Sequence, residues 1–109
     1  MTSYNLLNGV HTAERRDLIE DILRCEFGFK GIVMTDWVIA SGILNSKEDI
    51  YPRVTPCLTA AAGSDLFMPG STKDHENMIE GLASGKLTRE QLQINASRVY
   101  RMGRELSGK

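Results

Sequence analysis

The chain has 109 residues, of which 41% are hydrophobic and 25% charged, and these values suit a single globular domain over residues 1–109. The formal net charge is −1, with 13 basic and 14 acidic side chains and no basic stripe, which argues against a nucleic-acid partner. No apolar run approaches the ~18 residues that a membrane span needs, so a membrane partner is not expected either.

The first half of the chain alternates between strand-like and helix-like stretches. Residues 1–5 have the character of a strand end, and Asn8-Gly9 marks a turn. Residues 13–26 repeat their apolar side chains with helical spacing. Residues 31–35 (GIVMT) form a nearly continuous apolar run, which predicts a strand that is buried on both faces, as in a parallel sheet.

The second half continues this alternation. Residues 65–68 predict another short buried strand. Helices are expected over residues 54–62, 71–84 and 88–106, and a loop with some helix over residues 38–51. Thr88 with Gln91 forms a capping box for the last helix. The apolar stripe of that helix is predicted to consist of Leu92, Ala96, Val99, Met102 and Leu106.

Cysteine, histidine and asparagine patterns indicate no further site. Cys25 and Cys57 are expected to be free thiols, and the spacing of the two histidines does not suit a metal, so neither metal nor cofactor is predicted. Asn95-Ala96-Ser97 is a glycosylation sequon, but its position within a helix favours a chance match. The N-terminus lacks a signal-peptide pattern, and the sequence does not specify a compartment.

The order of elements, β-α-β-α-β-α-α, favours a parallel sheet with right-handed crossovers. The predicted fold class is α/β: a partial (β/α)8 (TIM-like) barrel fragment with two or three parallel strands and about four helices. A complete barrel takes roughly 250 residues, so this chain would form less than half of one.

Asp36 and Trp37 directly follow the first buried run, where parallel α/β folds place functional groups. A carboxylate beside a flat apolar ring suits glycoside chemistry, because sugar rings pack their C–H groups on aromatic faces. From the residues alone, the alternative is an Asp that caps the next helix or turn and a Trp that lies in the core. Asp65, at the start of the second buried run, is interpreted as structural.

Three stretches together resemble glycoside hydrolase family 3, which contains β-glucosidases and β-N-acetylhexosaminidases. They are residues 3–9 (SYNLLNG), 23–37 (LRCEFGFKGIVMTDW) and 62–70 (AGSDLFMPG). The resemblance implies that Asp36 is the catalytic nucleophile and that Trp37 contacts the sugar. It further implies that Tyr4 hydrogen-bonds the nucleophile and that Met68 lies near the substrate.

The resemblance also implies retaining hydrolysis of a β-glycoside, in which Asp36 forms a glycosyl-enzyme that water then releases. The family's acid/base and most of its sugar-binding residues belong to regions outside this stretch. We therefore expect a fragment that is weakly active or inactive alone. The alternatives are a half-barrel subunit that self-associates or needs a partner chain, and a non-catalytic carbohydrate-binding remnant. The sugar itself is left open, since Val38 and the long loop over residues 40–56 depart from the family pattern.

Overall fold

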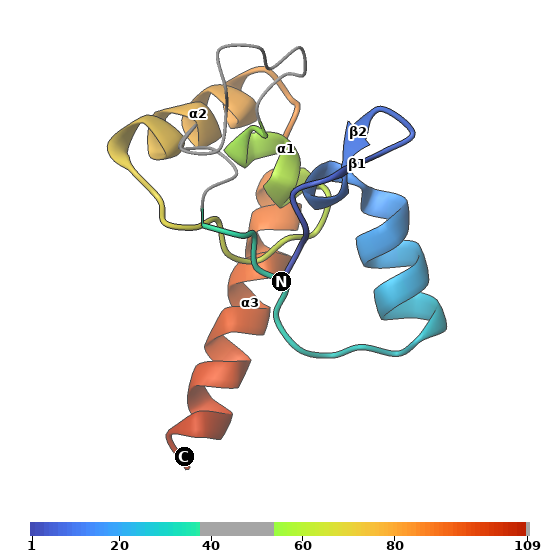
Figure 1. Cartoon of the computed structure of the whole chain (residues 1–109). Coiled ribbons are helices and arrows are strands. Elements are labelled where there is room, and N and C mark those ends of the chain that lie inside the picture. Colours follow the sequence, from blue (N-terminus) through green and yellow to red (C-terminus); the bar gives the residue numbers. More distant parts are fainter. Residues whose placement is uncertain (38–53, 109) are drawn as a thin grey trace.

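The computed structural model describes residues 1–37 and 54–108, so the predicted loop over residues 38–51 lies outside the described part. Helices surround a small group of extended segments, and the long helix α3 runs past them to the C-terminus (Figure 1). The elements in chain order are β1 (Leu6–Leu7), β2 (Val10–His11), η1 (Thr12–Glu14), η2 (Asp17–Glu26), α1 (Pro56–Ala61), α2 (Thr72–Ala83) and α3 (Arg89–Leu106). In the described ranges, no helix combines the length and the apolar character that a membrane crossing demands.

A tight hairpin forms around the predicted turn at Asn8-Gly9. Strands β1 and β2 pair antiparallel, with Leu7 opposite Val10. Asn8 and Gly9 have φ angles of 51° and 80°, as a two-residue hairpin turn of type I′ requires. The turn is confirmed, but the short strands lie on either side of it rather than over residues 1–5.

The helix predicted over residues 13–26 is divided into η1 and η2. The second piece is wound more widely than an α-helix, because the Phe27 amide donates to the Ile22 carbonyl, five residues back, at 3.0 Å. Ile19 is buried on the inner face of η2, where it packs with Val33 and Ala62. The apolar face predicted from the spacing is therefore present, although the helix is irregular.

Three extended segments lie side by side and join at Thr2, Met34 and Leu66, which we call the three-segment row. The Thr2 amide donates to the Met34 carbonyl at 2.9 Å, and Met34 forms an isolated parallel bridge with Leu66. The two or three regular parallel strands that were predicted are not shown, because the parallel pairing within residues 1–37 and 54–108 is limited to this bridge. One physical reason lies at Val33, whose amide donates to the Asp65 side chain at 2.8 Å instead of to a strand carbonyl.

Buried charges lie at the start of these segments. The carboxylate of Asp65, whose side chain is 0% exposed, binds Arg24 at 2.6 Å and Arg98 at 3.2 Å. Glu20 in η2 pairs with the same two arginines, at 3.5 Å and 3.0 Å respectively. These four residues, named here the Asp65 cluster, connect η2, the extended segment that carries Leu66, and α3. Their two positive and two negative charges balance. Asp65 thus has the structural role that its position indicated.

The helices α1 and α2 form as expected. Ser71 caps α2 by accepting a hydrogen bond from the Asp74 amide at 3.2 Å. The two helices lie so close that a Cβ on Gly81 would stand 2.5 Å from the Cβ of Cys57. Cys57 is buried and Cys25 exposed, and both are free thiols as predicted.

The predicted apolar stripe of α3 is present at Leu92, which packs against Cys57, Ala60 and Leu87, but it does not continue to Leu106, and the most buried side chains of the helix are polar. Leu106 is 83% exposed, whereas Gln91 and Asn95 are buried and Arg98 joins the Asp65 cluster. Asn95 is 4% exposed, and its side-chain nitrogen donates to the carbonyls of Ala60 at 2.9 Å and Ser64 at 3.1 Å. Long-range hydrogen bonds, and not apolar contacts alone, therefore hold α3 against α1 and the residues that follow it.

We expect Asp65→Ala to lower the free energy of unfolding by about 3–5 kcal/mol, because it leaves two arginines without their buried carboxylate. Urea unfolding followed by circular dichroism measures this change. The matched control is Asp21→Ala, since Asp21 is exposed on the same helix as Glu20. Equal unfolding midpoints for the two variants would contradict the assigned role of Asp65.

A second ion pair predicts a pH dependence of stability. The hydrogen bonds from Arg15 lower the pKa of Asp17 from 3.8 to about 2, with Nε of Arg15 lying 2.7 Å from Oδ1. The folded-state pKa is depressed, so the pair stabilises the fold above pH 3.8, and this contribution is lost as the pH falls toward 2. The stability difference between the natural chain and Asp17→Asn should shrink over that range. In an Arg15→Met background the same difference should not depend on pH in this way.

Candidate functional site

The candidate site lies just past the three-segment row. Each segment carries one predicted site residue two positions after the residue at which the segments join. These site residues are Tyr4, Asp36 and Met68. Because Met34 and Leu66 pair in parallel, Asp36 and Met68 leave the row in the same direction. The Thr2 hydrogen bond brings the segment that carries Tyr4 next to the segment that carries Asp36. The fold therefore assembles at one place segments that are about thirty residues apart along the chain.

Asp36 is partly buried at the end of its segment. Its Oδ1 accepts a hydrogen bond from the amide of Trp37 at 2.6 Å, which orients the carboxylate relative to its own backbone. The preceding residue, Thr35, is 0% exposed and fixes the backbone immediately before the carboxylate. Asp36 is thus a carboxylate on a fixed backbone with access to solvent, the kind of group that can act as a nucleophile or a base.

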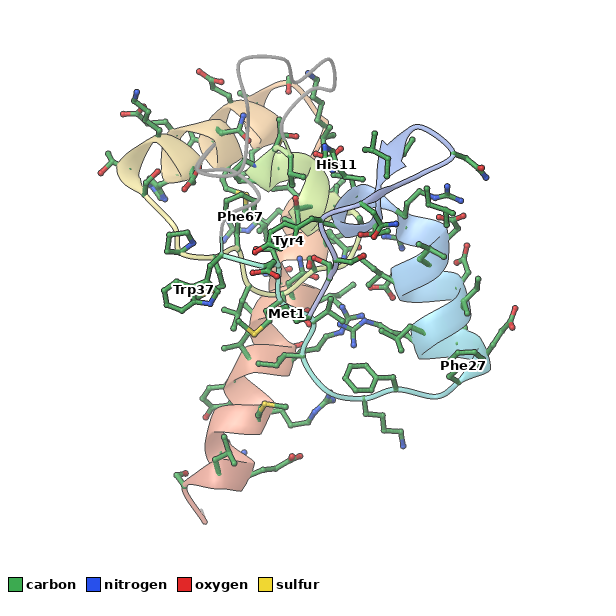
Figure 2. All side chains as sticks on the ribbon, viewed as in Figure 1. Met1, Tyr4, His11, Phe27, Trp37 and Phe67 are labelled. Carbon is green, nitrogen blue, oxygen red and sulfur yellow. The ribbon has the colours of Figure 1, made fainter. Side chains whose placement is uncertain are left out.

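The aromatic residues near Asp36 are accessible. Trp37 is 54% exposed, and its ring points away from the body of the chain (Figure 2). Tyr4 is 40% exposed and comes from the neighbouring segment. The alternative in which Trp37 is a core residue is therefore not what the structure shows, and the indole face is open to a ligand.

Thr35 connects the two parallel segments at the site. Its hydroxyl oxygen accepts a hydrogen bond from the amide of Met68 at 2.8 Å, and its own amide donates to the Leu66 carbonyl at 3.0 Å. Asp36 and Met68 are predicted site residues, whereas Thr35 is not predicted to have a role. A hydroxyl residue at the end of a buried apolar run was the signal that could have indicated it.

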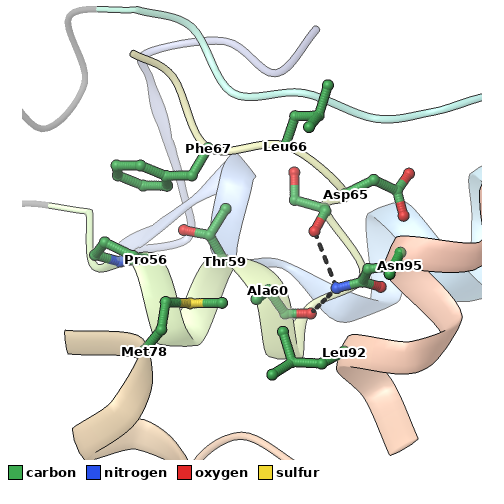
Figure 3. A pocket seen from close by; sticks show the side chains of 11 residues that line it. Pro56, Thr59, Ala60, Asp65, Leu66, Phe67, Met78, Leu92 and Asn95 are labelled. Carbon is green, nitrogen blue, oxygen red and sulfur yellow. Dashed lines mark hydrogen bonds between the residues drawn. The ribbon is translucent and has the colours of Figure 1, made fainter. Parts of the chain in front are cut away.

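A pocket of about 150 Å³ lies elsewhere, between the three α-helices and residues 64–67 (Figure 3). Its walls include Met78, Leu92 and Phe67, and neither Asp36 nor Trp37 lines it. The polar group of Asn95 in its wall already donates two hydrogen bonds. This pocket is therefore separate from the candidate site.

Metal-ligating side chains do not gather in the described ranges: no group of three or more His, Cys, Asp or Glu residues there could hold an ion. His75 is exposed in the first turn of α2.

Comparison with known proteins identifies relatives over most of the chain. Residues 1–102 match the family model described as the glycosyl hydrolase family 3 N-terminal domain. A β-glucosidase of Rhizobium radiobacter is 37% identical over 100 residues, which cover 91% of this chain and 11% of that protein. The chain thus spans about a tenth of the length of this curated relative.

Solved structures share the fold. The β-glucosidase from Listeria innocua, determined in complex with isofagomine, superimposes with a TM-score of 0.72 and 25% identity over 97% of this chain and 15% of that one. The β-N-acetylglucosaminidase from Thermotoga maritima has a TM-score of 0.65 and 23% identity over 87% of this chain and 22% of that one. The second likeness concerns the fold alone.

The exposure of Trp37 predicts its fluorescence behaviour, and this residue is the only tryptophan of the chain. Acrylamide should quench the emission of the folded protein with an efficiency comparable to that of the urea-unfolded protein. Strong protection from quenching in the folded state would show that the indole is buried, contrary to the structure.

Proposed function

The chain belongs to glycosyl hydrolase family 3, and from this premise we propose that it carries the nucleophile of a retaining β-glycosidase. Asp36 is the proposed nucleophile, and Tyr4, Trp37 and Met68 are the proposed substrate-binding residues. The substrate class is a β-glycoside, in line with the β-glucosidase names of the relatives. No metal or cofactor enters the proposed reaction.

One observation supports this proposal most. The three-segment row collects Tyr4, Asp36 and Met68 two residues beyond Thr2, Met34 and Leu66, the three residues at which the segments join. Functional groups of parallel α/β folds gather at the ends of neighbouring extended segments in this manner. A partly buried carboxylate next to an exposed indole also suits glycoside chemistry, because sugar rings pack their C–H groups on aromatic faces.

In the proposed reaction, the Asp36 carboxylate attacks the anomeric carbon while the glycosidic oxygen leaves. A glycosyl-enzyme ester forms, and water then hydrolyses it with retention of configuration. The Tyr4 hydroxyl orients the carboxylate by donating a hydrogen bond, and the exposed face of Trp37 packs against the sugar. A second carboxylic acid, about 5 Å from the nucleophile, must protonate the leaving oxygen.

The acid/base and further sugar-binding groups are proposed to come from outside the segment that this chain shares with its relatives, which is 11% of the Rhizobium enzyme. On this proposal the chain is one domain and a part of a (β/α)8 barrel, weakly active or inactive alone. The segments joined at Thr2, Met34 and Leu66 would then be neighbouring barrel strands, although the described part of the chain forms only one parallel bridge.

A second candidate function is that of a half-barrel subunit, which binds a partner chain or a second copy. The observation that favours it is the exposure of large apolar side chains, among them Phe27, which is 74% exposed. Size-exclusion chromatography over a range of concentrations tests self-association. A chain that remains monomeric at all of them would count against self-association.

The decisive experiment for the nucleophile is covalent labelling. We would incubate the chain with 2-fluoro glycosides of the gluco type that carry a good leaving group, and measure the intact mass. A good leaving group needs little general-acid assistance, and the fluorine slows hydrolysis of the ester, so an adduct should accumulate on Asp36. Peptide mapping would locate it.

Two variants serve as controls for this labelling. Asp36→Asn should abolish the adduct, whereas Asp21→Asn, which changes an exposed carboxylate on η2, should leave it unchanged. Labelling of a folded Asp36→Asn variant would refute the assignment of the nucleophile. Sugar binding without any adduct would instead favour a non-catalytic carbohydrate-binding remnant.

A further inference from the structure

We propose that Thr35 is a positioning residue, whose hydroxyl sets the place of Asp36 relative to Met68. The inference rests on the proposed function, since it assigns Thr35 a part in the action of the Asp36 nucleophile. Thr35 does not touch the substrate in this scheme. It acts through the backbone of the two parallel segments.

The local geometry gives Thr35 two connections to the neighbouring segment. Its amide donates to the Leu66 carbonyl at 3.0 Å, and its hydroxyl oxygen accepts from the Met68 amide at 2.8 Å. The side chain is 0% exposed, so water does not compete for either bond. As a β-branched residue, Thr35 also has few accessible rotamers, which keeps its hydroxyl in place.

The hydroxyl takes the place that a backbone carbonyl would have in a longer sheet. The parallel bridge joins Met34 to Leu66, and beyond it the two segments are connected by the Thr35 side chain. Asp36 directly follows Thr35, and Met68 is the residue whose amide the Thr35 hydroxyl binds. Loss of the hydroxyl would therefore break the hydrogen bond between the two segments at the proposed nucleophile and the proposed substrate-binding residue.

The expected effect on chemistry follows from the sensitivity of catalysis to position. A shift of about 1 Å in a reacting group can cost roughly 10²-fold in rate. Thr35→Val keeps the shape of the side chain but removes the acceptor for the Met68 amide. We expect it to slow the labelling of Asp36 by about 10- to 100-fold, and Thr35→Ser to restore most of the rate.

A second buried threonine provides the matched control. Thr59 is 1% exposed, and its hydroxyl donates to the Thr55 carbonyl at 2.8 Å within the region of α1. Thr59→Val removes a buried hydroxyl whose hydrogen-bond partner, the Thr55 carbonyl, lies outside the row. It should change the unfolding midpoint without altering the environment of Met68 or the labelling of Asp36.

The experiment combines two readouts on the full chain and on the variants Thr35→Val, Thr35→Ser and Thr59→Val. Amide hydrogen exchange, followed by nuclear magnetic resonance, reports the hydrogen bond of Met68. The 2-fluoro glycoside labelling rate reports Asp36. All variants are compared without denaturant, under conditions in which they are folded. We expect faster exchange of the Met68 amide and slower labelling of Asp36 in Thr35→Val only.

Either of two results would overturn the proposal: unchanged Met68 exchange in Thr35→Val, or faster exchange with labelling at the natural rate. A chain that gives no adduct in any form would show that the proposed nucleophile does not react in this chain alone, and this result would leave the role of Thr35 to the second readout. In that case Met68 exchange, together with the amide shifts of Asp36 and Trp37, decides the positioning role. Shifts that move in Thr35→Val but not in Thr59→Val would support it, and unchanged shifts would overturn it.

Discussion

The buried carboxylate of Asp65 is the constraint on which the other parts of the structure depend. A charge without solvent is costly unless it is paired and hydrogen-bonded, and Asp65 is held by Arg24, Arg98 and the amide of Val33. Each partner comes from a different part of the chain. Pairing and hydrogen-bonding this one carboxylate therefore requires η2, the segment that carries Val33, and α3 to meet at the same point.

The same carboxylate determines where the candidate site forms. Val33 and Asp65 join at the start of the two parallel segments, and the Thr35 hydroxyl joins them again at Met68. Between these side-chain connections lies a single parallel bridge. The segments are thus held in register at both ends by side chains, with little regular sheet between them. Asp36 directly follows this short, fixed pair of segments. Its backbone is therefore held in place although no long strand precedes it.

Local signals in the sequence were sufficient for part of this architecture. The helices α1, α2 and α3 and the turn at Asn8-Gly9 were predicted, because caps such as Ser71 and Thr88 act within a few residues of themselves. The hairpin, the division of η1 from η2 and the shortness of the parallel pairing were not. The shortness of the parallel pairing depends on competition between side-chain and backbone hydrogen bonds at Val33, whose side-chain partner, Asp65, lies 32 residues away. For the site, the residues alone indicated Asp36 and Trp37, while Tyr4 and Met68 came from the family resemblance, and the roles of all four stay predictions.

The buried, hydrogen-bonded position of Asn95 has a consequence for the biosynthesis of the chain. Its Nδ2 atom is the atom to which an N-linked glycan would attach, and it is also the donor to the Ala60 and Ser64 carbonyls. A sugar attached there would remove one of those two donors and would be too large for a residue that is 4% exposed. Modification and docking of α3 are therefore mutually exclusive. In an organelle that glycosylates proteins, a molecule would complete its fold only if α3 docked before a glycan was attached to Asn95.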